Sequence, residues 1–365
     1  MGPALLPEPL VAGNRVTLLH NGAEAYPCIL DAIAGASHSI LIEMYTWAND
    51  ATGRRFADAV AERARAGVQV RILYDAVGSK ETPTSLWSQL RLAGAAVTPY
   101  RPLGWFGTRK RDHRKLYVID GRRAFVGGLN IADEYAADWR DTGLELEGPI
   151  AAGLIKLFAE TWTAEEDDAL WRPNPPPPAA PAGPVPAGIL SGNNWRDYRS
   201  IAAAYLHAVK QARSRLWIAN AYFMPSLPFL RALRKARRRG VDVRILVPSR
   251  TDAWPVYHAT RSLFANLLAT GIRVFEWRGP MMHAKTAVID GELCLVGSYN
   301  LDHLSFARNL ELSVAVNDSV LGSAMEAMYE KDLENSDEVN REKWKQRPWS
   351  QKTLEWFWRL FRSAL

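Results

Sequence analysis

The sequence predicts an α/β fold of two similar lobes, each a mixed, mostly parallel sheet flanked by helices, related by a pseudo-twofold axis. Three observations predict this fold: a motif that occurs twice, a matching strand and helix pattern before each copy, and a proline-rich segment between the halves. The 365 residues are 48% hydrophobic and 23% charged, which is ordinary for a folded protein and sufficient for two buried cores.

The repeated motif has a histidine, a lysine two residues later and an aspartate five residues after the lysine. Its members are His113, Lys115 and Asp120 in the first copy, and His283, Lys285 and Asp290 in the second copy. The same separation of 170 residues relates Gly127 to Gly297 and Asn130 to Asn300, without a gap. An internal repeat of this kind predicts two copies of one structural unit.

The segments before the two motifs also match, with small changes in length. Residues 67–73 read GVQVRIL and residues 240–246 read GVDVRIL, while the apolar segment 40–45 resembles segment 216–222. Each half therefore reads as a strand, a helix, a β-branched strand, a second helix, a short strand and the motif hairpin. Strands that alternate with helices indicate βαβ units, so we expect a largely parallel sheet covered by helices.

A proline-rich segment separates the halves. Eight of the fourteen residues from Pro173 to Pro186 are proline, which removes backbone donors and favours an extended linker. We therefore expect an N-terminal lobe in residues 1–172, a linker in 173–186, a C-terminal lobe in 187–335 and a basic, tryptophan-rich tail in 336–365.

Each motif has the pattern of a strand, a tight turn and a returning strand. Strand alternation places the histidine and the lysine on one side, and Asp-Gly favours a tight hairpin turn. The returning strand brings Asn130, or Asn300 in the second copy, back beside the start of the first strand. One copy supplies one histidine, one lysine and one asparagine, so we expect two facing copies to build a single shared active site.

This set of side chains suits chemistry at a phosphodiester. Imidazole can act as nucleophile or proton carrier near neutral pH, while lysine and asparagine can bind phosphate oxygens. A single histidine–lysine pair is usually a surface pair, and a lone histidine is usually a satisfied core residue. Two copies with five matched positions at a constant separation favour catalysis over these simpler explanations.

The pattern HxKxxxxD, followed by GGxN or GSxN, resembles the HKD signature of the phospholipase D superfamily. Segments 125–135 (FVGGLNIADEY), 296–305 (VGSYNLDHLS) and 309–312 (NLEL) are similar to bacterial cardiolipin synthases of the short type, which lack N-terminal transmembrane helices. Segments 13–22 and 218–241 are similar to the same group. The resemblance covers nearly the whole chain except the linker and the tail, and it implies two phospholipase D-like lobes.

The resemblance also implies a role for each motif residue. One histidine attacks the phosphate and forms a phosphohistidine, and the other protonates the leaving alcohol. The usual family order makes His113 the nucleophile and His283 the acid, although the sequence itself leaves the order open. The phosphate would be held by Lys115, Lys285, Asn130, Asn300 and Ser298. Asp120 and Asp290 complete the catalytic motif, and we expect them to support the hairpins rather than touch the substrate.

A carboxylate in this family orients the histidine. Glu311, in its Asn-Leu-Glu context, resembles that residue, and its counterpart in the first half is expected to be Glu145 or Glu147. The first copy departs from the second where Gly128 replaces Ser298, which removes one hydroxyl from the first half-site.

The implied reaction joins two phosphatidylglycerols into cardiolipin plus glycerol. It exchanges one phosphodiester for another, so neither a nucleotide nor a metal is expected, and the sequence has no CxxC or HExxH spacing. Two alternatives remain: a hydrolytic phospholipase D, phosphodiesterase or nuclease of the same superfamily, and a non-catalytic membrane-binding protein. The basic runs 109–115 and 231–239 suit an anionic partner, but aromatic residues spaced to stack bases are not evident, so no nucleic acid is expected.

The tail predicts contact with a membrane. Residues 341–365 contain seven Lys or Arg against two Glu. Apolar residues follow helical spacing at Leu354, Phe357, Trp358, Phe361 and Leu365, and Trp356 and Leu360 widen this face. Such a face suits an interfacial helix on an anionic membrane, and the alternative is a terminal helix packed on the core. With no apolar run of about 20 residues and no signal peptide, we expect a peripheral protein on the cytoplasmic face of the cell membrane.

Overall fold

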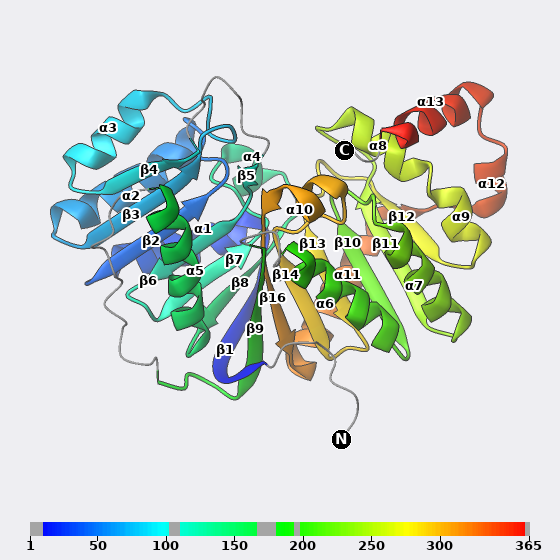
Figure 1. Ribbon diagram of the computed structural model, residues 1–365, viewed down its shortest axis with the longest axis horizontal. Coiled ribbons are helices and arrows are strands. Elements are labelled where there is room, and N and C mark those ends of the chain that lie inside the picture. Colours follow the sequence, from blue (N-terminus) through cyan, green and yellow to red (C-terminus); the bar gives the residue numbers. More distant parts are fainter. Residues whose placement is uncertain (1–9, 102–109, 166–179, 193–197, 362–365) are drawn as a thin grey trace.

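The computed structural model describes residues 10–101, 110–165, 180–192 and 198–361, which form two lobes side by side (Figure 1). The strands of the first lobe are β1 (Val11–His20), β2 (Ser39–Met44), β3 (Gln69–Asp75), β4 (Ala96–Tyr100), β5 (Arg111–Asp112), β6 (Lys115–Ile119), β7 (Arg123–Gly127) and β8 (Thr142–Glu147). Its helices are α1 (Asn21–Ala34), α2 (Ala51–Arg65), α3 (Thr84–Leu92), α4 (Asp133–Ala137) and α5 (Ile150–Glu165).

The second lobe has a similar order of elements, with additional helices and a short strand after its motif instead of before it. Its strands are β9 (Val185–Ser191), β10 (Arg215–Asn220), β11 (Asp242–Pro248), β12 (Arg273–Trp277), β13 (Lys285–Ile289), β14 (Leu293–Gly297), β15 (Asn309–Leu310), β16 (Leu312–Asn317) and β17 (Ser336–Glu338). Its helices are α6 (Tyr198–Gln211), α7 (Leu227–Arg238), α8 (Trp254–Arg261), α9 (Phe264–Ala269), α10 (His303–Ala307), α11 (Ser319–Glu334), α12 (Arg341–Lys345) and α13 (Trp349–Leu360).

One sheet of fifteen strands runs through both lobes. Outward from its centre, the first lobe has the order β1-β8-β7-β6-β2-β3-β4, and the second has β9-β16-β14-β13-β10-β11-β12, with β17 added at the edge. The two halves meet where β1 pairs with β9, and this reversed order is what a pseudo-twofold relation requires. The prediction of two similar α/β lobes is confirmed.

The prediction that each sheet is mostly parallel is wrong. Only β2-β3-β4 in the first lobe and β10-β11-β12 in the second pair in parallel, whereas the other pairings of the large sheet are antiparallel. The physical reason is the motif hairpin, since a tight turn can connect only antiparallel strands. The hairpin and its neighbours occupy the middle of the sheet, and the βαβ units lie outside them.

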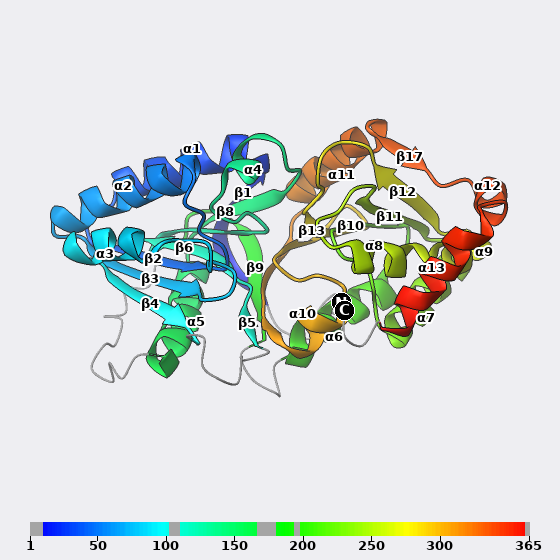
Figure 2. The same cartoon turned by 90° about the horizontal axis from the view of Figure 1, so that it is seen from above.

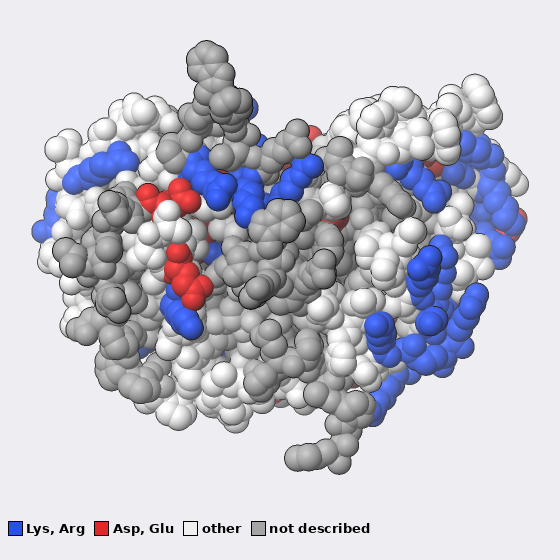
Figure 3. Space-filling view, viewed as in Figure 1, with Lys and Arg blue, Asp and Glu red and all other residues white. Residues whose placement is uncertain are grey.

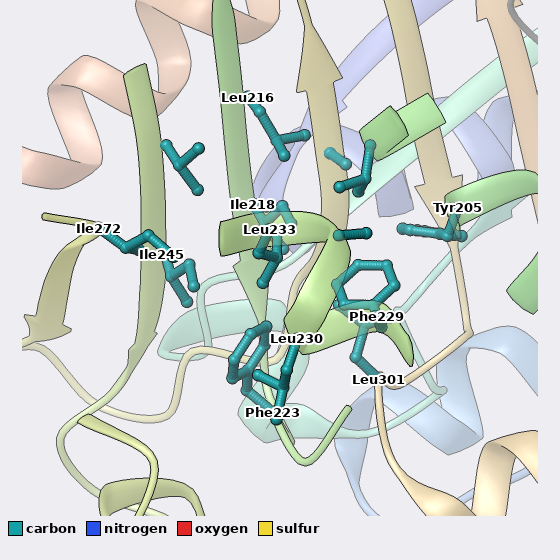
Figure 4. Close-up of a cluster of buried hydrophobic side chains, with 14 of the residues drawn as sticks. Tyr205, Leu216, Ile218, Phe223, Phe229, Leu230, Leu233, Ile245, Ile272 and Leu301 are labelled. Atoms are coloured by element: carbon teal, nitrogen blue, oxygen red, sulfur yellow. The ribbon is translucent and has the colours of Figure 1, made fainter. Parts of the chain in front are cut away.

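The lobes share part of their hydrophobic core. One cluster fills the first lobe below α1, α2 and α3, and a second fills the other lobe around α6, α7 and α9, where Figure 4 shows part of it. A third cluster contains residues of both lobes, including Phe158 of α5 and Tyr329 of α11. Figure 2 shows α1 and α2 on one face of the sheet and α6 and α7 on the opposite face. Because apolar surface is buried between the lobes, we expect them to fold as one unit.

The predicted boundaries differ from the elements that the structure contains. Residues 173–179 of the predicted linker lie outside the described residues, and Val185 near its end already belongs to β9. The predicted tail is part of the second lobe from its first residue, because β17 pairs antiparallel with β12. Trp344 of α12 is also a member of the core cluster.

Candidate active site

Both motifs reach the junction of the lobes, where each lobe pairs with the backbone of the other. The short strands β5 and β15 pair in parallel, and an isolated bridge joins Arg140 to Met282. The His113 backbone N–H donates to the carbonyl of Leu310 at 2.9 Å, and that of His283 donates to the carbonyl of Arg140 at 2.7 Å. Each motif histidine is therefore held in place by the opposite lobe.

The side chain of each histidine also bonds a carboxylate of the opposite lobe. Nδ1 of His113 lies 3.1 Å from both carboxylate oxygens of Glu311, and Nδ1 of His283 lies 2.8 Å from Oδ2 of Asp141. A carboxylate at Nδ1 fixes the ring orientation and leaves Nε2 for a ligand. All four side chains are buried. The site is thus composite, since neither lobe holds a complete histidine–carboxylate pair.

Glu311 lies where the sequence predicts an orienting carboxylate, but Glu145 does not. The Glu145 carboxylate instead accepts from Nε of Arg123 at 2.7 Å, and Glu147 pairs with Arg15. Both are strand residues of β8, and Asp141 lies just before that strand. The signal that identifies Asp141 is the repeat itself, because 170 residues also separate it from Glu311.

The first lobe has Gly128 where the second lobe has Ser298, and the two orienting carboxylates explain this difference. A Cβ on Gly128 would lie 2.3 Å from Oδ1 of Asp141, so a side chain there would displace this carboxylate. In the second lobe the Ser298 hydroxyl donates to Glu311 and accepts from the backbone N–H of Leu312. The predicted phosphate-binding role of Ser298 is therefore not supported, because its proton is directed at Glu311.

The two motif lysines are buried at the site. Nζ of Lys115 donates to the carbonyl of His113 at 2.6 Å, and Nζ of Lys285 donates to the carbonyl of His283. Burial, opposed in part by nearby carboxylates, lowers the pKa of Lys115 to about 7 and that of Lys285 to about 8. The charge of Lys285 further lowers the pKa of Lys115, so the two lysines lie within electrostatic reach of each other. A bound phosphate would favour their charged forms.

The two imidazoles share this environment. Burial and then the charge of Lys115 lower the pKa of His113, although Glu311 opposes them. Burial, followed by the charges of both lysines and of His113, holds the pKa of His283 well below its usual value. Both rings are held at the junction of the lobes, because the backbone N–H of each histidine donates to a carbonyl of the opposite lobe. In the unliganded protein both rings are neutral near pH 7, as a nucleophile requires.

The motif asparagines differ in their contacts. The Asn130 side chain accepts from the backbone N–H of Thr46 at 3.1 Å and donates to the Tyr135 hydroxyl at 2.7 Å. Oδ1 of Asn300 is buried and has no hydrogen-bond partner among the residues that the structure describes. A buried amide with an unused group is a candidate for binding a ligand, and rotation of the amide would present Nδ2 instead.

Asp120 and Asp290 bind the backbone of neighbouring loops. The Asp120 carboxylate accepts from the backbone N–H groups of Ser37, His38 and Ser39 at 2.7 to 2.9 Å. Asp290 binds residues 213–215 in the same way at 2.7 to 2.9 Å. Both aspartates have positive φ, 50° and 56°, in the turn of the motif hairpin. These bonds fix the loops before β2 and β10 to the hairpin.

Sequence reasoning missed the aromatic residues and one ion pair around the site. The ring of Tyr45 lies 4.7 Å from that of His113, and those of Tyr135 and Trp139 lie 5.2 and 5.6 Å from that of His283.

Arg140 forms a buried two-point ion pair with Asp332 of the other lobe, at 2.8 and 2.7 Å. This pair supports the carbonyl that holds His283. Its partners are 192 residues apart in the chain, so no local pattern indicates it.

Comparisons with known proteins find relatives that match most of this chain. A family model described as cardiolipin synthase, PLD-like domain, matches residues 29–162 and 205–333. The probable cardiolipin synthase YwiE of Bacillus subtilis (strain 168) is 35% identical over 96% of this chain and 72% of its own length. Cardiolipin synthase A of Pseudomonas putida is 36% identical over 93% of this chain and 72% of its own length. A solved phosphatidylserine synthase of Haemophilus influenzae Rd KW20 has the same fold, with a TM-score of 0.77 over 98% of both chains at 15% identity.

Proposed function

The chain belongs to the family of cardiolipin synthases with phospholipase D-like domains, and on this premise we propose that it is a phosphatidyltransferase that joins two phosphatidylglycerols into cardiolipin and glycerol. One observation carries the proposal: two imidazoles from opposite lobes each bond a carboxylate of the other lobe at one buried, cationic centre. This arrangement supplies a nucleophile and a proton carrier for a single phosphodiester.

In the proposed reaction, Nε2 of His113 attacks the phosphorus of the first lipid and forms an N–P bond. Binding of the anionic phosphodiester raises the pKa of His283, so this ring takes up a proton on Nε2 and gives it to the departing glycerol oxygen as the P–O bond breaks. A hydroxyl of the second phosphatidylglycerol then loses its proton to His283 and attacks the phosphorus, which releases His113. Lys115, Lys285 and Asn300 stabilise the charge on the non-bridging oxygens in both steps.

The choice of His113 as nucleophile rests on its carboxylate. A phosphorylated imidazole that keeps its proton on Nδ1 carries positive charge for the lifetime of the intermediate. Although burial opposes ionisation, the interactions with His113 and Lys115 lower the pKa of Glu311, so this partner stays anionic. An anion at Nδ1 stabilises the phosphorylated ring.

Product analysis tests the function. We expect labelled phosphatidylglycerol, offered in vesicles to the purified protein, to yield cardiolipin and an equal amount of glycerol. Phosphatidic acid as the main product would identify a hydrolase instead, and cleavage of DNA or RNA a nuclease. Vesicle binding without any turnover would identify a non-catalytic membrane protein.

The lipid substrate requires contact with a membrane, and we propose that α13 provides it on the cytoplasmic face. The outward side chains of this helix include Trp349, Trp356 and Leu360, which are 80%, 59% and 57% exposed. The helix is docked on the second lobe, because the buried carboxylate of Glu355 lies 3.8 Å from Nε of Arg261 on α8 and Trp358 packs against the core cluster. Leu365 of the predicted apolar face lies outside the described residues. No described helix is long and apolar enough to span a membrane.

Vesicle sedimentation tests this contact. Replacing Trp356 and Leu360 with Ala should weaken binding to phosphatidylglycerol vesicles by about tenfold or more, because two large apolar side chains no longer enter the interface. Leu92→Ala is the matched control, since Leu92 of α3 is 90% exposed and distant in the sequence. Equal vesicle binding by all three proteins would contradict the role of α13.

A further inference from the structure

A cavity of about 570 Å³ lies in the second lobe between α6, the start of α7 and the start of α10. Its walls are mainly apolar and include Ala203, Leu206, Met224, Phe229 and Leu301. Phe229 and Leu301 are also members of the core cluster, and Figure 4 shows them close together. The volume lies within the range of about 300–1,000 Å³ that is usual for small-molecule sites. None of the described lining residues is Lys or Arg, so the cavity is unsuited to a phosphate headgroup.

The cavity adjoins the candidate active site. Tyr299 and Leu301, which flank Asn300 of the second motif, are both in its wall. Asp302 is in the wall as well, and its carboxylate accepts from the backbone N–H of Ser305 at 2.7 Å at the start of α10. The Ser305 hydroxyl in turn donates to Glu311 at 2.7 Å. One helical turn therefore separates the cavity wall from the carboxylate that holds His113.

The first lobe has close packing where the second lobe has the cavity. Asp50 and Ser226 are equivalent N-caps of α2 and α7, so Gly53 corresponds to Phe229. A Cβ on Gly53 would lie 1.8 Å from the carbonyl oxygen of Ala48, so α2 lies directly against the preceding loop. A Cβ on Gly22 of α1 would lie 2.1 Å from the carbonyl oxygen of Tyr135, so α1 and α4 are also in direct contact. The two lobes thus diverge at this position.

We infer that this cavity binds an acyl chain of the phosphatidyl substrate while its phosphate lies between the two motifs. The inference rests on the proposed function, because it requires a lipid substrate. The apolar wall fits a hydrocarbon chain, and the position beside Asn300 lets one lipid place its phosphate in the site and one tail in the cavity. Each buried methylene group should raise affinity by roughly fourfold.

Chain-length dependence tests the cavity through activity. For the unaltered protein we expect kcat/KM to rise steeply from a dihexanoyl to a dioleoyl lipid dispersed in the same detergent. Ala203→Trp would fill the cavity from the exposed side of α6 and should lower the ratio of the two values by about tenfold or more. Ala23→Trp, on an exposed position of the counterpart helix α1, is the control and should keep the ratio. An unchanged ratio in Ala203→Trp would overturn the assignment.

Photo-crosslinking tests the cavity without turnover or substitution. A phosphatidylglycerol with a photoreactive group near the end of one acyl chain should label segments 202–206 and 224–229. Labelling only on α13 would place the tail at the membrane surface and overturn the inference, as would labelling that an excess of unlabelled dioleoyl phosphatidylglycerol does not reduce. If the lipid labels these segments but no cardiolipin forms, the proposed function fails and the cavity assignment stands.

Discussion

The two half-sites contain the same imidazole and lysine but differ in the carboxylate. Glu311 accepts hydrogen bonds from the hydroxyls of Ser298 and Ser305 in addition to His113. Asp141 accepts a backbone N–H bond from Thr142 at 2.7 Å besides its contact with His283. Burial raises the pKa of Asp141 to about 6, although Lys285 opposes it, whereas the pKa of Glu311 is below its usual value.

This difference shows how a duplicated site can acquire two roles. The longer glutamate is compatible with a serine beside it, and the shorter aspartate is compatible only with Gly128. Glu311, whose pKa is below its usual value, stays ionised near neutral pH and suits the ring that carries the phosphate. Asp141, with a pKa of about 6, suits the ring that releases and regains a proton. That ring is neutral for part of the reaction, so it needs less support from an anion than a phosphorylated ring does.

Replacing either histidine should have the largest effect on activity, and the two variants should differ in which step is lost. With a phosphatidyl ester of p-nitrophenol, which leaves without an acid, His283→Ala should release about one p-nitrophenolate per chain and then stop, since the phosphohistidine cannot transfer its group onward. His113→Ala should release none, with kcat at least about 10⁴-fold lower. Mass spectrometry of the burst product should find the adduct on His113. An adduct on His283 would reverse the assignment, and circular dichroism checks that both variants fold.

Neutralising the carboxylates should have the next largest effect. Glu311→Gln should lower kcat by about 10³-fold, because the charge that stabilises the phosphorylated ring is lost. Asp141→Asn should lower it less, by about 10²-fold. Glu145→Gln is the control at one of the two positions that the sequence suggests, and its kcat should stay within about twofold of the unaltered protein. Equal losses in the two site variants would show that the half-sites are equivalent.

The pH profile should reveal the titrating groups. Since the pKa of Asp141 is raised to about 6, kcat/KM should fall as the pH drops through about 6 and this carboxylate is neutralised. It should fall again as the pH rises through about 7 to 8, where Lys115 and then Lys285 lose their charge. Lys115→Arg keeps a charge at all these pH values, so the alkaline limb should move to about 8. An alkaline limb that stays near 7 in this variant would contradict the assignment to Lys115.

The ion pair between Arg140 and Asp332 should affect stability more than chemistry. Asp332→Asn leaves a buried guanidinium without its anion, and urea unfolding should show a loss of about 3–5 kcal/mol. We expect kcat to fall by about tenfold, because the carbonyl of Arg140 positions His283. Glu147→Gln, which breaks the exposed pair with Arg15, should change the unfolding midpoint far less. A matching small shift in both variants would show that the inter-lobe pair is dispensable.

Local patterns predicted the elements but not their pairing partners. The Asp-Gly turns and the alternation of His113 and Lys115 correctly placed the motif hairpins, because turn chemistry and strand period act over a few residues. The same reasoning gave a mostly parallel sheet, since it counted βαβ units and neglected how many strands the hairpins contribute. It also proposed Glu145 or Glu147 by residue type, although the constant separation of 170 residues already indicated Asp141.

The sequence by itself determined that this protein has two equivalent lobes with a histidine, a lysine and an asparagine in each, because a repeated motif encodes a repeated local structure. Only the tertiary structure decided which carboxylate serves which histidine. His113 and Glu311 are 198 residues apart, and His283 and Asp141 are 142 apart. Contacts of that separation depend on how the two lobes pack, and packing is a property of the whole shared core.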